Sequence, residues 1–340
     1  MDGSCCRVAE SPARHNASVN VAAIVLAGGV GSRMRPLTDA CPKPLLPLGA
    51  EPLVGYQLRR LAAVGVRRVV LATGYLAASF DAVLGNGTQW GLELTYSVED
   101  QPLGTGGAMH AAAALLPDAD RLVVLNGDLL SSHDLAAQLR AAPAGAVSVH
   151  VRSVADVAPY GQVVFGPDRR VTGFHEKSGR GPGWANAGTY VVPGDFLRTL
   201  PDGRCSWERD VLPAAIEGQA RVEAWPADGY FRDVGDPTAY RQACVDAVCG
   251  DLPGGSRPAC TRYVAASAVI AANARLTGGS SVHEKATVAA GAWLDGCVVL
   301  PGVQVGAGAR LRRCVVAAGA VVAAGEKRTD AIVTGVPTRR

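Results

Sequence analysis

The chain has 340 residues, a formal net charge of +3 at pH 7 and 48% hydrophobic residues. A chain of this length is expected to form about two domains and to bury a large core. Its charges are mixed in sign, and no apolar run approaches the roughly 18 residues that a membrane-spanning helix needs. We therefore expect no nucleic acid and no membrane among its partners.

The cysteines and the N-terminal segment indicate the compartment. The nine cysteines are scattered, with no CxxC pair and no cysteine–histidine cluster at zinc spacing. Such usage is typical of a reducing compartment. Residues 1–20 have no apolar stretch of the kind that a secretory signal needs, so we expect a flexible leader there. Together these features predict a cytoplasmic protein.

The chain up to about residue 145 alternates short apolar runs with segments of helical spacing. The expected strands are Val21–Leu26, Arg68–Thr73, Leu92–Val98 and Arg121–Leu125, and the expected helices are Pro52–Val64, Ala77–Leu84 and Gly106–Leu116. This alternation predicts a doubly wound α/β layer with parallel strands.

The pattern changes after about residue 145, where glycine and proline separate shorter strands. These strands are Val147–Val151, Gly161–Phe165, Val171–His175 and Gly188–Val192, and helical spacing returns near Glu208–Glu217 and Pro237–Val248. We expect the short strands to form an inserted antiparallel layer. Residues 21–250 are predicted to be one domain.

A six-residue period begins at about residue 262. Apolar residues recur at Val264, Ile270, Leu276, Val282, Val288, Leu294 and Leu300, and small residues stand four places after most of them. The register slips near Pro301 and resumes at Val305. This period predicts a parallel β-helix over residues 260–335, with the apolar residues inside. Because such coils often serve subunit contact, we expect a homo-oligomer.

The glycine-rich stretch LAGGVGSRMRPLT follows the first strand directly. Gly28, Gly29 and Gly31 let backbone N–H groups approach an anion closely. Arg33 can donate two hydrogen bonds to phosphate oxygens, and Lys43 is a point charge with a proline on either side. The stretch is neither a Walker A loop nor GxGxxG, and an ordinary glycine-rich turn is the alternative. We predict a polyphosphate site.

This stretch resembles the signature of the sugar-1-phosphate nucleotidyltransferases, LAGGxGTRLxPLT followed by PKPLLP. Ser32 and Met34 replace the family's threonine and leucine, which are mild changes. Further matches in the family's order are PLGTGGA at Pro102–Ala108, NGD at Asn126–Asp128, HEK at His175–Lys177, NAGTYV at Asn186–Val191 and FRDVGDPTAY at Phe231–Tyr240. The resemblance spans about residues 20–335, and it is greatest to mannose-1-phosphate guanylyltransferase-like enzymes. It implies a Rossmann-like nucleotidyltransferase domain followed by a left-handed β-helix.

Two aspartates form the predicted metal site. Asp128 ends a buried strand after a glycine, and Asp233 lies in a second glycine-containing loop. Mg²⁺ prefers oxygen ligands from one or two carboxylates together with substrate phosphates, and the resemblance implies this role for both residues. Either aspartate alone could instead be a helix cap or a turn residue. Asp236 is expected to cap the helix that begins at Pro237.

The resemblance also implies the substrate contacts. The nucleotide is expected to contact Leu26, Ala27, Gly28, Gly29, Gly31, Arg33, Glu99 and Gly104; the sugar phosphate is expected to contact Gly161, Glu176, Lys177 and Asn186; the catalytic residues are expected to be Arg33, Lys43 and Lys177. The family usually has proline after the lysine of HEK, and Ser178 stands there instead, which leaves the shape of the sugar pocket open. His175 is expected to be structural rather than a base.

The base and the acceptor are less defined. Glu99 or Asp100 could accept the N1–H and N2–H donors of guanine, although acids before a turn are often only surface residues. PLGTGGA resembles guanylyltransferases for mannose-1-phosphate and heptose-1-phosphate, so GTP is expected, while related stretches occur in enzymes that use dTTP or UTP. A cyclitol-1-phosphate of the valienol-1-phosphate type is an alternative acceptor.

The implied reaction is a single displacement assisted by Mg²⁺. A sugar-1-phosphate oxygen attacks the α-phosphorus of the nucleoside triphosphate, and pyrophosphate leaves in line. A non-catalytic, sugar-nucleotide-sensing regulatory subunit is the alternative from another class. Such a subunit is expected to lose Arg33, Lys43, Asp128 or Asp233, and all four are present. A β-helix acyltransferase would need a histidine at a coil edge, where only His283 is available.

Overall fold

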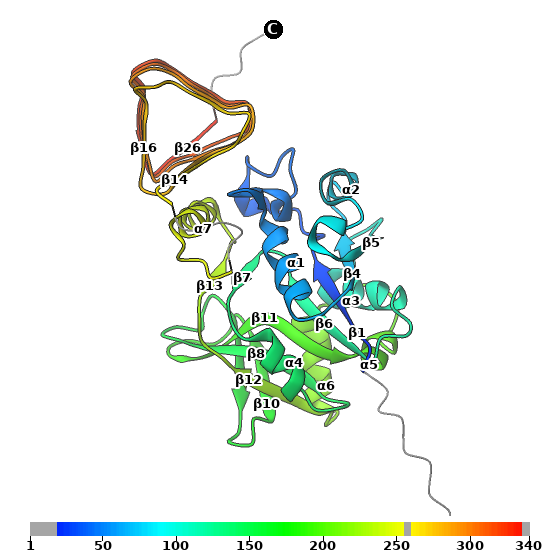
Figure 1. Cartoon of the computed structure of the whole chain (residues 1–340). Helices are drawn as coiled ribbons and strands as arrows, with labels where there is room; N and C mark the ends of the chain where they lie inside the picture. Colours follow the sequence, from blue (N-terminus) through cyan, green and yellow to red (C-terminus); the bar gives the residue numbers. More distant parts are fainter. Residues whose placement is uncertain (1–18, 255–259, 335–340) are drawn as a thin grey trace, which may run out of the picture.

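The computed structural model describes residues 19–254 and 260–334. The predicted leader lies almost wholly outside these ranges. An α/β body holds most of the chain, and a triangular coil of short strands stands at one end of it, with helix α7 (Pro237–Cys249) between them (Figure 1). Among the described residues, no helix combines the length and the apolar character that a membrane crossing requires.

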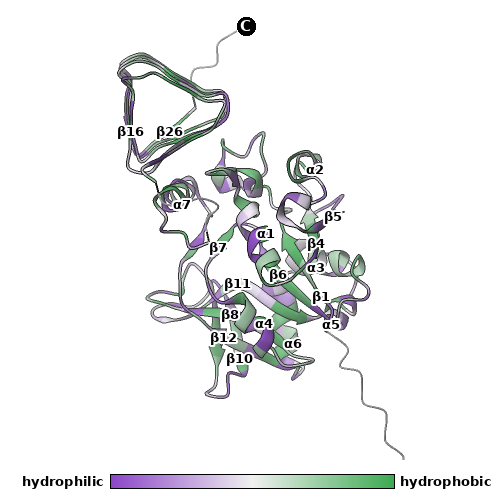
Figure 2. Cartoon of the chain, in the orientation of Figure 1, coloured by the Kyte–Doolittle hydropathy of each residue, from purple (hydrophilic) through white to green (hydrophobic). Residues whose placement is uncertain are grey.

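Parallel strands form the centre of the body. They are β1 (Val21–Leu26), β4 (Arg68–Thr73), β5 (Glu93–Val98) and β6 (Arg121–Asn126), in the spatial order β6-β1-β4-β5. Figure 2 colours β1 and β4 mainly as hydrophobic, as expected for central strands that are covered on both faces. The chain runs outward from β1 to β5 and then returns to the other side of β1. The strand order therefore reverses between β1 and β6, and α/β sheets bind ligands at the carboxyl ends of the strands at such a point.

Helices cover the two faces of the sheet. They are α1 (Leu53–Ala63), α2 (Ala78–Leu84), α3 (Gly104–Ala114), α4 (Leu135–Ala141), α5 (Gly194–Arg198) and α6 (Leu212–Glu217), the last preceded by a π-helical turn at Trp207–Val211. Ala22 and Ile24 pack in the same core as α3, α5 and α6, whereas Ala23 and Val25 pack with α1, α2 and α4. This alternation along β1 is that of a doubly wound sheet, as predicted.

Helix α3 begins two residues before the predicted start. Its first turn contains three glycines, which a propensity argument disfavours. The reason is close packing: the N–H groups of Gly106 and Gly107 donate to the Cys205 carbonyl oxygen at 3.0 and 3.3 Å. A Cβ on Gly104 would lie 2.5 Å from that same oxygen, and Gly104 has φ +72°. The glycines therefore let the helix start against another backbone segment.

The later strands are β8 (Val147–Val154), β9 (Gly161–Phe165), β10 (Val171–Glu176), β11 (Gly183–Pro193) and β12 (Val222–Pro226). Strands β8 to β11 pair antiparallel with one another, as predicted, but they continue the main sheet and do not form a layer of their own. Strand β11 pairs antiparallel with β6 and joins the two halves. The physical reason is that β6 would otherwise present an unpaired edge. Strand β12, which was not predicted, pairs parallel with β8.

Two small sheets lie outside the main one. Strands β2 (Pro47–Leu48) and β3 (Glu51–Pro52) form a hairpin, and β7 (Leu129–Ser131) pairs antiparallel with β13 (Phe231–Asp233). The second of these joins the segment after β6 to the segment before α7.

The C-terminal coil is a parallel β-helix, as predicted, and it has three faces. Its first face is β14 (Arg262–Val264), β17 (Ser280–Val282), β20 (Val298–Val299), β23 (Val315–Val316) and β26 (Ile332–Val333); its second is β15 (Val269–Ile270), β18 (Thr287–Val288), β21 (Gln304–Val305) and β24 (Val321–Val322); its third is β16 (Arg275–Thr277), β19 (Trp293–Asp295), β22 (Arg310–Arg312) and β25 (Lys327–Thr329). Leu276, Leu294 and Leu311 are stacked in register inside it.

The register slip lies before β20 and not near Pro301, so the inward residue of that strand is one position earlier than predicted. Val299, not Leu300, pairs with Val282 and faces the interior. Three positions separate Asp295 from Val298, whereas four separate their partners, Thr277 and Ser281. The corner after β19 is therefore one residue shorter. Leu300 packs instead in the core that contains α7.

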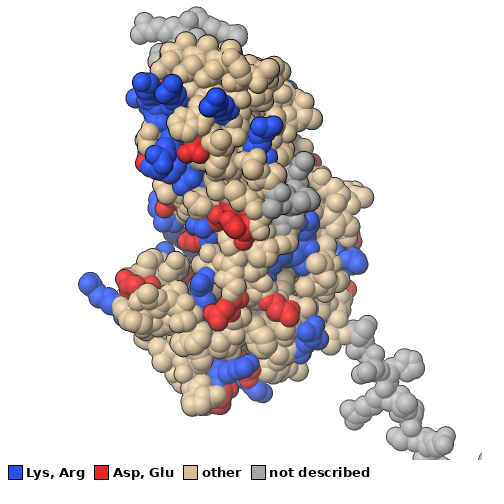
Figure 3. All heavy atoms as spheres, turned by 60° about the vertical axis from the view of Figure 1, so that its left-hand side comes forward, with Lys and Arg blue, Asp and Glu red and all other residues tan. Residues whose placement is uncertain are grey.

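Basic side chains gather on the β-helix (Figure 3). The outward positions of the third face carry Arg275, Arg310, Arg312 and Lys327, with Asp295 as the acid among them. This basic face is not visible in the sequence, where charges of both signs are mixed. Only alternate residues of each short strand point outward and contribute to it.

Candidate active site

A cavity of about 330 Å³ lies at the carboxyl ends of β1, β4 and β6. Its lining is Leu26, Ala27, Gly28, Gly29, Gly31, Lys43, Pro44, Ala72, Glu99, Pro102, Gly104, Thr105, Ala108, Asn126 and Asp128. It lies where the strand order reverses, and the glycine-rich loop forms one of its walls. Of the predicted nucleotide contacts, only Arg33 lies outside the lining.

Arg33 instead lies against the loop that contains Asp233. A Cβ added to Gly235 would lie 3.1 Å from Nη2 of Arg33, so the guanidinium rests on the bare backbone there. The Arg33 side chain is exposed, on a 3₁₀ turn that follows Gly31 with φ +64°. The left-handed backbone at Gly31 therefore turns the chain out of the cavity and carries Arg33 to its rim.

Lys43 and Asp128 meet at the cavity wall. The Lys43 ammonium forms an ion pair with Oδ2 of Asp128, and the two side chains are 12% and 30% exposed. Asp128 reaches this position because Gly127 packs on β1: its N–H donates to the Leu26 carbonyl oxygen at 2.9 Å. A Cβ on Gly127 would lie 2.8 Å from the same oxygen, so a larger residue would push the loop away.

The two predicted metal ligands are brought together by the β7–β13 pair. Asp233 stands opposite Leu129, the residue after Asp128. The N–H of Val234 donates to the Asp128 carbonyl oxygen at 3.0 Å. Two residues that are far apart in the sequence thus stand on adjacent backbone segments.

The Asp233 carboxyl is half-buried and lies among several charged side chains. Burial raises the pKa of the Asp233 carboxyl above its ordinary value, and the negative charge of Asp128 raises it further. The positive charges of Lys43, Arg33 and Lys177 act in the opposite direction and lower it. Arg33, Lys43, Asp128 and Lys177 are therefore all within electrostatic reach of Asp233.

The carboxylate pair fits a magnesium ion that shares its ligands with a substrate. Within residues 19–254 and 260–334, no group of three His, Cys, Asp or Glu side chains converges, so the protein does not form a complete metal cage there. Mg²⁺ usually keeps several waters and takes one or two carboxylates plus phosphate oxygens. Asp128 and Asp233 are a donor set of this type.

The predicted sugar-phosphate side is formed by β9, β10 and the loop after them. Gly161 pairs with Glu176, and a Cβ there would lie 2.7 Å from Oε2 of Glu176. Lys177 has φ +53°, and its N–H donates to the Tyr160 carbonyl oxygen at 3.2 Å. A left-handed backbone at a non-glycine residue costs on the order of 1–3 kcal/mol and is common at functional sites. His175 is exposed.

Asn186 holds an irregular turn within β11. Its Nδ2 donates to the Tyr190 hydroxyl oxygen at 2.7 Å, and its Oδ1 accepts from the Gly188 N–H at 3.1 Å. The pairing with β8 shifts register between Asn186 and Tyr190. Gly188, at φ +61°, comes so close to Asn126 that a Cβ would lie 2.8 Å from its Nδ2. The side chain of Asn186 thus has partners within the protein, and a contact with the sugar stays a prediction.

Asn126 belongs to the NGD motif, but no role was predicted for it from the sequence. It lines the cavity, and its buried Oδ1 has no hydrogen-bond partner among the described residues. A buried acceptor of this kind usually finds a partner, so a ligand donor or water is expected to meet it. The NGD motif itself was the signal that could have identified it.

The two candidate base readers differ in position. Glu99 lines the cavity, and its Oε2 accepts from the Leu103 N–H at 3.1 Å. Burial raises the pKa of the Glu99 carboxyl, although this hydrogen bond lowers it. Asp100 is exposed. The prediction for Asp236 is confirmed: it caps α7 by accepting from the Ala239 N–H at 2.8 Å.

Comparison with known proteins identifies the family. The nucleotidyl transferase family matches residues 22–248, and the GlmU-like C-terminal hexapeptide family matches residues 256–328. The chain belongs to the nucleotidyl transferase family and carries a C-terminal hexapeptide domain. The family, the fold class and the enzyme class that were predicted from the sequence are thus confirmed.

Relatives within the family carry related names. The chain is 37% identical over 298 residues to a mannose-1-phosphate guanylyltransferase of Mycobacterium tuberculosis, covering 85% of this chain and 82% of that protein. It is 31% identical over 224 residues to a D-glycero-alpha-D-manno-heptose 1-phosphate guanylyltransferase of Aneurinibacillus thermoaerophilus, covering 65% of this chain and 96% of that protein.

Two solved structures of HddC from Yersinia pseudotuberculosis are also similar. The first has a TM-score of 0.58 and 29% identity, and it covers 66% of this chain and 98% of that chain. The second, described as complexed with GMP-PN, has the same TM-score, the same coverage and 28% identity.

Proposed function

We propose that this chain is a Mg²⁺-dependent guanylyltransferase that joins GTP to a sugar-1-phosphate, with mannose-1-phosphate as the first candidate, and releases pyrophosphate. The observation that carries the proposal is the Lys43–Asp128 ion pair at the cavity wall with Asp233 on the adjacent backbone segment, where the charges of Arg33 and Lys177 also act on Asp233. The names of the relatives favour guanine as the base, and mannose or a manno-configured heptose as the sugar. Self-association through the β-helix and a cytoplasmic location remain predictions.

The cavity suits a nucleotide with its phosphates toward the rim. The glycine-rich loop offers backbone N–H groups without side chains in the way. Gly104 and Thr105, at the N-terminus of α3, also line the cavity, beside Leu103, whose N–H donates to Glu99. Arg33 at the rim is positioned for the β- and γ-phosphates. The base would then lie toward Glu99.

The residues around Asp233 suit an in-line displacement. Lys177 orients the sugar phosphate, whose oxygen attacks the α-phosphorus, and Lys43 neutralises charge that develops on the α-phosphate. No general base is required, because a phosphate monoester is mostly deprotonated at pH 7. Mg²⁺ held by Asp128 and Asp233 would supply further positive charge to the phosphates. Pyrophosphate leaves, with Arg33 retaining its contact.

The direct test is pyrophosphate release from the common nucleoside triphosphates, each paired with a panel of sugar-1-phosphates. The panel includes mannose-1-phosphate, heptose-1-phosphate and a cyclitol-1-phosphate, and each pair is assayed with and without Mg²⁺. We expect the highest kcat/KM with GTP and mannose-1-phosphate, and no release without the metal. Release with another pair would overturn the specificity and keep the mechanism. No release with any pair would favour a regulatory subunit.

Replacing Glu99 tests the base assignment. Glu99→Gln keeps the shape of the side chain but cannot accept both guanine donors, so kcat/KM for GTP should fall by roughly 10- to 100-fold, the effect of losing a hydrogen bond to a charged group. ATP should be affected much less. Asp100→Asn is the matched control, since its carboxylate is exposed, and it should leave the preference for GTP unchanged. The reverse pattern would assign the base to Asp100.

A further inference from the structure

Strand β13, which ends in Asp233, has little rigidity of its own. It is three residues long and pairs with β7 in a sheet of only these two strands. A two-stranded sheet is marginally stable alone, so something else must hold the strand in place. Successive side chains of a strand point to opposite faces, and Arg232 therefore points away from the face that carries Asp233.

Arg232 is bound to a buried carboxylate of α7. Its Nε and Nη2 donate to Oδ2 of Asp246 at 3.0 and 2.8 Å. The Tyr230 hydroxyl donates to the same oxygen at 2.6 Å, and Nε2 of Gln242 donates to Oδ1 at 2.8 Å. Asp246 is 5% exposed, and each of its carboxylate oxygens accepts at least one hydrogen bond. This cluster, Tyr230–Arg232–Gln242–Asp246, clamps β13 to α7.

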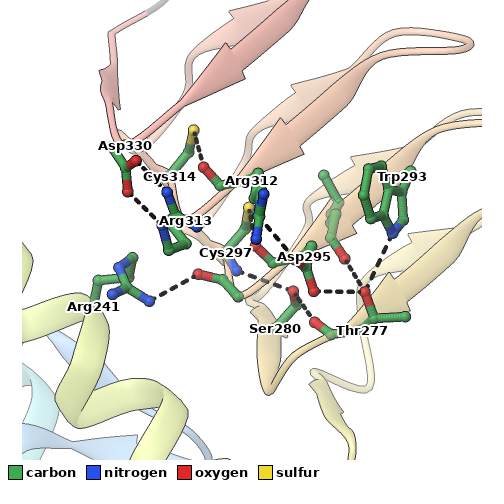
Figure 4. Close-up of polar contacts among 12 residues, drawn as sticks. Arg241, Thr277, Ser280, Trp293, Asp295, Cys297, Arg312, Arg313, Cys314 and Asp330 are labelled. Atoms are coloured by element: carbon green, nitrogen blue, oxygen red, sulfur yellow. Dashed lines mark hydrogen bonds and ion pairs between the residues drawn. The ribbon is translucent and has the colours of Figure 1, made fainter.

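Helix α7 is in turn held between the body and the β-helix. Its Arg241 donates to the Gly296 carbonyl oxygen at 3.3 Å, and Figure 4 shows this side chain reaching from α7 to the coil. One hydrophobic core contains Tyr240 of α7, Val234 beside Asp233 and Val298 of the β-helix. The element that clamps β13 is therefore itself fixed by the β-helix.

We infer that Asp246 is a positioning residue for the metal site: through Arg232 it holds β13 so that Asp233 stays beside Asp128. The inference rests on the proposed function, since it assumes that these two carboxylates bind Mg²⁺. It assigns a task to a residue that touches neither substrate nor metal. It also makes the β-helix part of the support of the catalytic site.

A merely structural ion pair makes a different prediction. Breaking a buried pair lowers stability because one charge is left unpaired, whatever the pair does for function. Loss of stability is therefore no evidence for positioning. The distinguishing readout is the affinity of the folded protein for a divalent cation, because groups that hold metal ligands in place contribute to metal affinity, typically 10- to 100-fold when they contact the ligand directly.

The experiment compares Asp246→Asn and Arg232→Gln with the full-length wild type. Mn²⁺ binding to the protein, without and with GTP, is measured by electron paramagnetic resonance, alongside the melting temperature and the Mg²⁺ concentration for half-maximal pyrophosphate release. Both variants should bind Mn²⁺ about 10-fold more weakly, the lower end of that range because neither residue contacts Asp233 directly, and need correspondingly more Mg²⁺. Their kcat at saturating Mg²⁺ should fall much less. The double variant should lose no more Mn²⁺ affinity than the single variant that binds Mn²⁺ less tightly, because the two residues act as one unit.

Asp118→Asn is the matched control. Asp118 accepts from Arg68 at 2.8 and 3.0 Å, which is a similar forked pair at the exposed surface. Its Mn²⁺ affinity should equal that of the wild type. If the two charge variants do not fold, Tyr230→Phe replaces them as the test, because it removes only one hydrogen-bond donor to Asp246. It should weaken Mn²⁺ binding severalfold.

The outcomes separate this inference from the proposed function. Wild-type Mn²⁺ affinity in the folded variants, with only a lower melting temperature, would overturn the positioning role and leave the proposed function intact. A wild-type protein that binds no Mn²⁺, with or without GTP, would remove the metal site itself and the inference with it. Equal weakening in Asp118→Asn would also overturn it, because the effect would then be general.

Discussion

Asp128→Asn is expected to lower kcat by about 10³-fold. The bound metal stabilises the charge of the transition state by several kcal/mol, and the variant loses most of this stabilisation. The amide has nearly the same shape, but it ends the ion pair with Lys43 and is a weaker ligand for Mg²⁺. The fold should persist, because the substitution also relieves the repulsion between Asp128 and Asp233. Steady-state pyrophosphate release and thermal unfolding together test both statements.

Asp236→Asn is the control for this variant. Asp236 lies three residues after Asp233 and caps α7, and asparagine is an equally good N-cap. Its turnover should remain near that of the wild type. Near-normal turnover in Asp128→Asn would take Asp128 out of the metal site.

Arg33→Ala should lower kcat/KM for GTP by roughly 10²-fold, the effect expected when charge-assisted hydrogen bonds to phosphate are lost. The guanidinium lies against Gly235, at the junction of the two loops, and its removal leaves the cavity lining in place. The KM for the sugar phosphate should change little. Arg33→Lys should recover only part of the loss, since an ammonium cannot donate in the same forked geometry.

Arg35→Ala serves as the control on the same loop. Arg35 is exposed and pairs with Asp39 at 3.3 Å, so its removal should leave nucleotide use unchanged. An unchanged kcat/KM for GTP in Arg33→Ala would contradict the role proposed for Arg33.

Electrostatic reasoning alone would not have placed Asp128 and Asp233 side by side. Two adjacent carboxylates repel each other, and burial adds to the cost, which is why the pKa of Asp233 is raised. The fold holds them together by the β7–β13 pair and by the clamp between Arg232 and Asp246. A site whose carboxylates are costly without a cation is one that a cation stabilises.

Local patterns in the sequence were sufficient for several results. The parallel strands, the surface helices and the six-residue period were predictable because each depends on spacing within a few residues. The glycine-rich loop was readable for a similar reason, since a close backbone approach requires bare backbone at fixed positions. The order of the motifs was enough to indicate the family.

The tertiary structure decided what depends on pairing between distant segments. The sequence contains no local signal that β11 joins β6, that Val299 rather than Leu300 faces the coil interior, or that Arg232 meets Asp246. Likewise, Glu99 and Asp100 are adjacent acids in the sequence, and only the fold turns one of them into the cavity. The physical reason is that periodicity reports which face of an element is buried, whereas partners are chosen by the packing of the whole chain.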